Sequence, residues 1–111
     1  PQTESIFVRT IYPINKDVLW LGTTTNGVYC LNIDKKELTH PIQKGNITSF
    51  YQDSESELWI GSWEEGLFRV KADGTIENFK YNAKDPHSLS SNFVRACCED
   101  NLGNIWVLST D

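Results

Sequence analysis

The sequence predicts an all-β protein built from four-stranded antiparallel blades, the repeating unit of a β-propeller. Three observations support this class. An apolar block centred on a tryptophan recurs, with the tryptophans 39 and then 47 residues apart: Leu19–Gly22, Leu58–Gly61 and Ile105–Val107. A β-branched residue lies twelve positions before each tryptophan: Val8, Ile47 and Val94. A glycine, Gly27 or Gly66, lies seven positions after the first two tryptophans. A period near 40 with these features is typical of one β-meander per repeat.

Short β-like runs separated by polar turns follow one another along the chain, and none has the period and caps of a helix. The first repeat predicts strands at Ile6–Tyr12, Val18–Thr23, Val28–Ile33 and Glu37–Ile42. The second predicts strands at Ile47–Gln52, Leu58–Ser62, Leu67–Lys71 and Thr75–Tyr81. The third begins with Phe93–Glu99 and Ile105–Ser109. Residues 1–111 therefore form part of one propeller domain of about two and a half blades, with repeats at about 6–42, 47–81 and from 93 onward.

Turn residues and strand polarity support the order of strands within a repeat. Asp73-Gly74 is a strong hairpin signal. Asp53 and Asp100 follow the first strands of their repeats, where their carboxylates are expected to cap the next hairpin. The tryptophan strands are apolar on both sides, which indicates burial on both faces. The fourth strand is the most polar (Glu77, Asn78 and Lys80), as expected of an outer edge.

Composition limits the classes of function. The chain has 111 residues, a net charge of −5 and a pI of about 4.9, which argues against a nucleic-acid surface. No run has the length of a membrane span. The sequence starts at Pro1, contains no methionine, and has both ends inside the repeat pattern, so we expect a piece of a longer protein.

The three cysteines show neither a CxxC spacing nor a cysteine–histidine cluster, so the sequence predicts no metal site and no cofactor. Cys97 and Cys98 are adjacent in a predicted strand and should point to opposite faces. We expect free, buried thiols in the core.

Several motifs resemble the two-component regulator propeller repeat. They are the run Asp85–Asn92 (Asp-Pro-His-Ser-Leu-Ser-Ser-Asn), then Val94-Arg95, Glu99-Asp100 and Gly103–Trp106, and in the second repeat Leu58–Trp63 with Gly66-Leu67. The resemblance covers nearly the whole chain. Two departures stand out: Leu108 replaces the glycine expected after Trp106, and Thr23–Asn26 replaces the Ser62–Glu65 turn.

The resemblance implies a place in the sensor region of a bacterial hybrid two-component protein. In that family, two tandem propellers precede an immunoglobulin-like domain, a membrane span and a histidine kinase. It also implies a periplasmic location, signal transduction to transcription regulation, and recognition of oligosaccharides released from polysaccharides. No kinase, immunoglobulin-like or membrane segment occurs in these 111 residues, so the resemblance implies no catalytic residue and no membrane contact here.

Candidate ligand-binding residues are Trp63, Glu64, Arg9 and Arg95. Trp63 lies in a predicted turn beside Glu64, and an aromatic ring next to a carboxylate suits the apolar face and the hydroxyls of a sugar. The alternative is a tryptophan that lies across the neighbouring blade. Arg9 and Arg95 occupy the same place in their repeats as Thr48, directly after the β-branched residue of the predicted inner strand, and could bind an anionic ligand. The alternative is an arginine bonded to an adjacent loop.

A structural role is expected for the residues that recur at blade spacing. We predict that these tryptophans and glycines belong to the core: Trp20, Trp59, Trp106, Gly22, Gly61, Gly27 and Gly66.

Three functions compete on this fold. The first is a ligand-sensing propeller of a periplasmic receptor; the others are a non-catalytic scaffold that binds protein, and part of a propeller lyase or glycosidase. An enzyme would need paired carboxylates or a histidine-based constellation on one face, which the sequence does not show. Two and a half blades leave blade faces uncovered, so the sequence also predicts self-association of the isolated chain.

Overall fold

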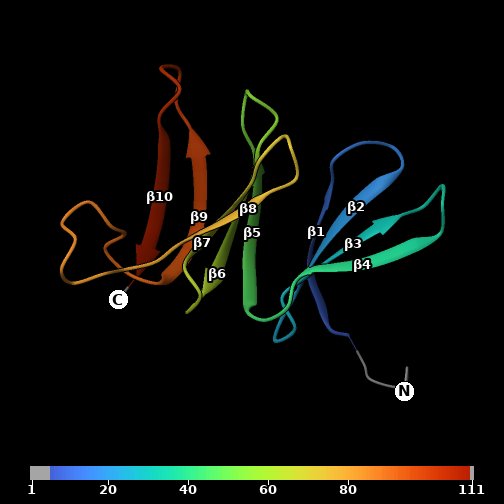
Figure 1. Cartoon of the computed structure of the whole chain (residues 1–111), viewed down its shortest axis with the longest axis horizontal. Helices are drawn as coiled ribbons and strands as arrows, with labels where there is room; N and C mark the ends of the chain where they lie inside the picture. The colour runs from blue at the N-terminus through green and yellow to red at the C-terminus, as the bar shows by residue number, and fades with distance from the viewer. Residues whose placement is uncertain (1–5, 111) are drawn as a thin grey trace. The chain divides into compact units, whose positions relative to one another are not determined.

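The computed structural model describes residues 6–110, which form ten β-strands and no α-helix (Figure 1). Within this range, no helix has the length and apolarity needed to cross a membrane. The chain divides into two compact units, residues 1–47 and 48–111, which are described separately. The all-β prediction is confirmed, and the predicted ranges of β2, β4 and β9 coincide with the observed ones.

The N-terminal unit is a four-stranded antiparallel sheet with its strands in chain order. The strands are β1 (Val8–Pro13), β2 (Val18–Thr23), β3 (Val28–Asn32) and β4 (Glu37–Ile42). Neighbouring strands in the sheet are also neighbours in sequence, so each pair is joined by a short turn (Figure 1). This meander is the blade that the first repeat predicts.

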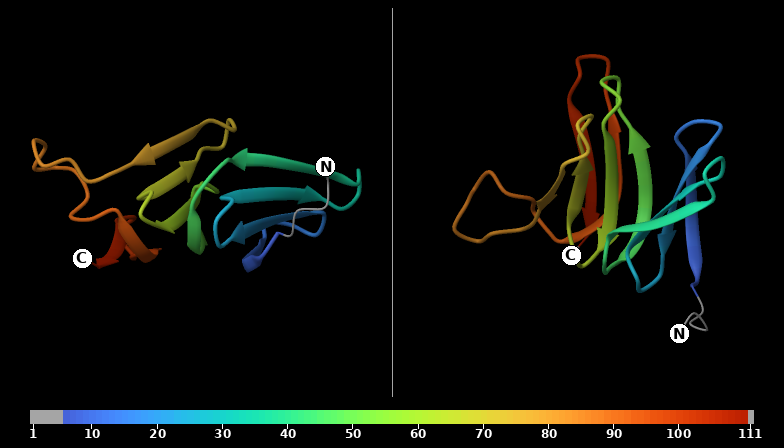
Figure 2. Two further views of the ribbon diagram at one scale, coloured as in Figure 1. Left: turned by 90° about the horizontal axis from the view of Figure 1, so that it is seen from below. Right: turned by 45° about the vertical axis from the view of Figure 1, so that its right-hand side comes forward.

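The C-terminal unit contains a second blade and the start of a third. Its strands are β5 (Asn46–Gln52, which begins in the first unit), β6 (Leu58–Trp63), β7 (Leu67–Val70), β8 (Ile76–Phe79), β9 (Phe93–Glu99) and β10 (Ile105–Thr110). β5 pairs with β6, β6 with β7, and β7 with β8, while β9 and β10 form an antiparallel hairpin. One ladder position, Trp63 with Phe93, joins the blade to the hairpin. A long connection between β8 and β9 projects from the sheet (Figure 2).

The core of the C-terminal unit lies where the third repeat packs against the second. Trp59 on β6 and Leu67 on β7 cluster with Val94 on β9, and Ile105 and Val107 on β10 pack against this cluster. Trp59 is only 8% exposed, and Val94 is completely buried. The tryptophan of one repeat is thus covered by strands of the repeat that follows it.

Trp106 corrects the expectation that all three repeated tryptophans are core residues. Its side chain is 63% exposed, whereas Trp20 is half-buried and Trp59 is buried. Alternation along β10 explains this, because Ile105 and Val107 face the core cluster and Trp106 points to the opposite face. Among the described residues 48–110 of the C-terminal unit, no strand covers that face.

The cysteines are free, but only in part buried. Cys97 packs against the core cluster, and burial raises the pKa of its thiol to about 12, so the thiol stays protonated at neutral pH. Cys98 points to the opposite face of β9 and is exposed, which corrects the expectation of a buried thiol there. Cys30 is half-buried on β3.

An aspartate caps the hairpin before the tryptophan strand in two repeats, as the sequence predicts. Asp53 Oδ1 accepts hydrogen bonds from the backbone amides of Glu55 and Glu57, and Oδ2 accepts one of 2.8 Å from Trp59 Nε1. Asp100 makes the same contacts in the third repeat: Oδ1 with the amides of Leu102 and Asn104, and Oδ2 with Trp106 Nε1 at 2.8 Å. The carboxylate therefore fixes both the loop and the indole ring.

We expect the hairpin of the third repeat to weaken only at very acid pH. The Trp106 indole, followed by backbone amides, lowers the pKa of Asp100 to about 2, from an ordinary value near 3.9. A depressed pKa means that the stabilisation is complete above the unfolded-state pKa and is lost as the pH falls through about 2. A ¹³C NMR titration of the Asp100 carboxyl should give this midpoint. In Trp106→Phe, which lacks the indole donor, the midpoint should rise; an unchanged midpoint would contradict the assignment.

Candidate ligand-binding edge

The turn between the second and third strands is built in the same way in the first two repeats. Ser62 donates its backbone N–H and its hydroxyl to the Gly66 carbonyl, at 3.1 and 2.8 Å, and its Oγ accepts the amide of Glu65. Thr23 makes the corresponding bonds to Gly27 and Asn26. The pattern of a hydroxyl residue followed four positions later by glycine therefore specifies a closed, rigid turn.

Asn92 ties the Trp63–Gly66 turn to the connection between β8 and β9. Its backbone carbonyl accepts the amides of Glu64 and Gly66, at 3.1 and 3.0 Å, and its side-chain Oδ1 accepts the amide of Tyr81. The turn, the connection and the start of β9 therefore share one edge of the C-terminal unit. The sequence predicts this arrangement, because the second-to-third turn and the link to the next repeat lie at the same end of a four-stranded meander.

Trp63 lies at this edge as the last residue of β6, with 37% of its side chain exposed. Its ring contacts Phe93 edge to face, with the centroids 4.9 Å apart. Phe93 begins the first strand of the next repeat, so Trp63 lies across the neighbouring blade, as the alternative interpretation expected. The exposed part of the ring is still available as a platform at the edge.

Glu64 is exposed and has a backbone φ of 94°, a conformation that residues other than glycine rarely adopt. Thr25, at the same place in the turn of the first repeat, is not among the residues of positive φ. The turn closes with either residue, so it does not itself require the strain at Glu64. Such strain costs about 1–3 kcal/mol and is concentrated at functional sites.

Arg9 and Arg95 differ from Trp63 and Glu64 in their surroundings. In the N-terminal unit, Arg9 on β1 donates a hydrogen bond of 2.5 Å to Asn46 Oδ1 at the start of β5. In the second repeat, Thr48 occupies the same position and donates to the Val94 carbonyl on β9 at 2.7 Å. In both repeats, the side chain at this position thus donates a hydrogen bond to the first strand of the next repeat. Arg95 is an exposed bulge residue of β9, close to the edge that carries Trp63.

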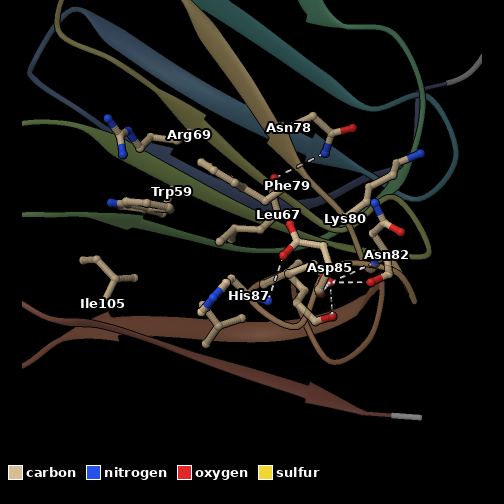
Figure 3. A pocket seen from close by; sticks show the side chains of 13 residues that line it. Trp59, Leu67, Arg69, Asn78, Phe79, Lys80, Asn82, Asp85, His87 and Ile105 are labelled. Carbon is tan, nitrogen blue, oxygen red and sulfur yellow. Dashed lines mark hydrogen bonds between the residues drawn. The ribbon is translucent and has the colours of Figure 1, made fainter.

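A cavity of about 520 Å³ lies between the second blade and β10 (Figure 3). The rings of Trp59 and Phe79 line its floor with centroids 6.1 Å apart, and Arg69 lies 5.4 Å from the Trp59 ring centroid. Ile105 lies across the cavity from Trp59, and Asp85 and His87 of the connection also line it (Figure 3). Aromatic rings together with polar side chains accommodate either a sugar ring or apolar side chains of another strand. Residues from four separate segments line this cavity, so no single motif in the sequence predicts it.

The repeated turn, the aspartate–indole cap and the four-stranded meander together define this chain as a segment of tandem β-propeller repeats. Residues 41–64 and 88–111 match the family model of the two-component regulator propeller. No curated protein sequence matches the chain.

Solved structures with the same fold come from Bacteroides thetaiotaomicron. The extracellular domain of one hybrid two-component system matches with a TM-score of 0.77 and 25% identity, over 92% of this chain and 13% of that one. The extracellular domain of another matches with a TM-score of 0.77 and 18% identity, over 98% of this chain and 15% of that one. The chain thus spans about one seventh of the length of the structures it matches.

Proposed function

We propose that this chain is part of the extracellular, periplasmic sensor region of a bacterial two-component receptor, and that its Trp63–Gly66 edge contacts an oligosaccharide. The family match and the likeness to extracellular domains of two-component systems support the class of receptor. One observation of the structure supports the ligand-binding edge: Glu64 is strained and exposed beside a half-exposed tryptophan, on a turn that Asn92 fixes from the next repeat.

The chemistry of the edge fits a neutral or weakly charged carbohydrate. The exposed part of Trp63 offers an apolar aromatic surface for a sugar ring, and the Glu64 carboxylate accepts hydrogen bonds from hydroxyl groups. Binding would order few side chains, because the turn is already closed by Ser62 and tied to Asn92. Arg95 is exposed two residues after Phe93, the partner of Trp63, and would supply a cationic contact to the ligand, whereas the Arg9 side chain is hydrogen-bonded to Asn46.

We expect Glu64→Gly to stabilise the fold and weaken ligand binding. Glycine adopts the observed φ without strain, so the free energy of unfolding should rise by about 1 kcal/mol, while the carboxylate acceptor is lost. Chemical denaturation measures the first effect. NMR titration with a panel of xylo-, malto-, manno- and fructo-oligosaccharides measures the second, in the 111-residue chain and in the longer receptor.

Trp63 provides the matched pair of variants for the same titration. Trp63→Ala should abolish the ligand-induced shifts, while Trp63→Tyr, which keeps an aromatic platform, should retain most of the affinity. If no oligosaccharide shifts the Trp63 or Glu64 resonances in the longer receptor, or if Trp63→Ala binds as the parent does, the edge is not the ligand-binding site.

A further inference from the structure

A glycine two positions after the tryptophan makes room for the next repeat in both complete blades. A methyl group added to Gly22 would lie 2.6 Å from Ile47 Cγ2. A methyl group added to Gly61 would lie 3.0 Å from Val94 Cγ1. Ile47 and Val94 are completely buried, and both are the β-branched residue twelve positions before a tryptophan. Each glycine therefore receives the first β-branched side chain of the following repeat.

Leu108 occupies this glycine position in the third repeat. Thr10 pairs with Gly22 across the first blade, and Ala96 pairs with Leu108 in the third. A methyl group on Gly22 would lie 2.7 Å from Thr10 Cγ2, so a larger residue there would clash within its own blade. Ala96 has no γ atom, which lets the third blade accommodate leucine. Leu108 is 59% exposed and therefore projects from the face that receives the next repeat in the other blades.

Four residues define the outer face of the β9–β10 hairpin: Ala96, Cys98, Trp106 and Leu108. Pairing of Trp106 with Cys98, and of Leu108 with Ala96, places them together. In the second repeat the corresponding face is covered by Val94, Ile105 and Val107 of the third. The outer face is thus the open counterpart of an interface that the same chain forms one repeat earlier.

We propose that the outer face of the β9–β10 hairpin is a docking surface for the first strand of a further propeller repeat, and that Leu108 selects a strand with glycine, alanine or serine at the position of Val94. A β-branched residue does not fit, because even a single methyl group at the glycine position already crowds Ile47 and Val94. The occupant is a further repeat of the same longer protein, since the chain spans only 13% and 15% of the structures it matches.

A second copy of this chain does not offer a first strand with a small residue at the position of Val94. Val8 on β1 is the β-branched residue of the first repeat, and it is 44% exposed. It precedes the bulge at Arg9, as Val94 precedes the bulge at Arg95, so β1 offers the same local geometry. Leu108 would clash with Val8 in the repeat geometry. Self-association of the chain, which its open faces predict, should therefore not use this contact.

Head-to-tail association of the 111-residue chain tests the size rule, with Val8 as the probe. Leu108→Gly removes the side chain that would clash with Val8, and Val8→Ala supplies a side chain that fits against Leu108. Overpacking typically costs about 1–3 kcal/mol, so each single variant should raise the association constant in sedimentation velocity by about 5- to 150-fold. The double variant should associate less tightly than either single variant, because it leaves a cavity.

Cys98 reports whether association uses the outer face. Thiol labelling followed by mass spectrometry should show slower modification of Cys98 in both associating variants and unchanged modification in the parent chain; far-UV circular dichroism confirms that each variant is folded. The proposal is overturned if either single variant associates no more tightly than the parent, if Cys98 stays fully reactive in the associated state, or if the parent chain already protects Cys98.

Discussion

Replacing Trp59 by alanine should lower the free energy of unfolding by roughly 3–5 kcal/mol, the range for deleting a buried aromatic side chain. Trp59 is 8% exposed, clusters with Leu67 and Val94, and donates its indole N–H to Asp53 at 2.8 Å. The substitution removes apolar contacts on the face shared with the third repeat and also leaves Asp53 without its indole donor. Urea denaturation followed by far-UV circular dichroism measures the loss.

Trp106→Ala is the matched control for this experiment. Trp106 occupies the same place in its repeat and donates the same hydrogen bond to an aspartate, but its side chain is 63% exposed. The loss should be about 1 kcal/mol or less, close to the net value of one hydrogen bond. Equal losses for the two variants would mean that the hairpin cap, and not burial between repeats, accounts for the stability that these tryptophans supply.

The comparison of Trp59 with Trp106 also shows what the sequence can predict. Local pattern sets the strands, so alternation and turn residues predict β2, β4 and β9 with their observed ends. Asp53 and Asp100 cap their hairpins as expected, because the interaction stays within six residues. Burial of a tryptophan depends instead on what packs against its blade, and the same motif is buried in one repeat and exposed in another.

The candidate site likewise has features that the local sequence predicts and features that depend on packing between repeats. The repeat order places the Trp63 turn beside the connection between β8 and β9, and the bonds to Asn92 show this arrangement. No sequence pattern predicts the positive φ of Glu64, since Thr25 occupies the same place in an equivalent turn without a positive φ. The cavity over Trp59 and Phe79 combines residues from distant segments, and only the packing of the third repeat on the second brings them together.

Gly66→Ala should be the most damaging exchange of a glycine in the C-terminal unit. Its φ of +80° alone costs an alanine about 1–2 kcal/mol, and the new methyl carbon would lie 2.2 Å from the Phe79 carbonyl oxygen. The turn must therefore move, which breaks the bonds from Ser62 to the Gly66 carbonyl and from the Gly66 amide to Asn92. With about 1 kcal/mol for each bond, the expected loss is roughly 3–5 kcal/mol.

Gly74 separates the steric part of this effect from the conformational part. It has a φ of +90°, but a methyl group added there would meet nothing within 4 Å. Gly74→Ala should therefore cost only the conformational term of about 1–2 kcal/mol. Gly27→Ala should match Gly66→Ala, because its methyl carbon would lie 2.2 Å from the Ile42 carbonyl oxygen. If the losses for Gly66→Ala and Gly74→Ala are equal in urea denaturation, the turn is not held against β8 and the edge that carries Trp63 and Glu64 is not rigid.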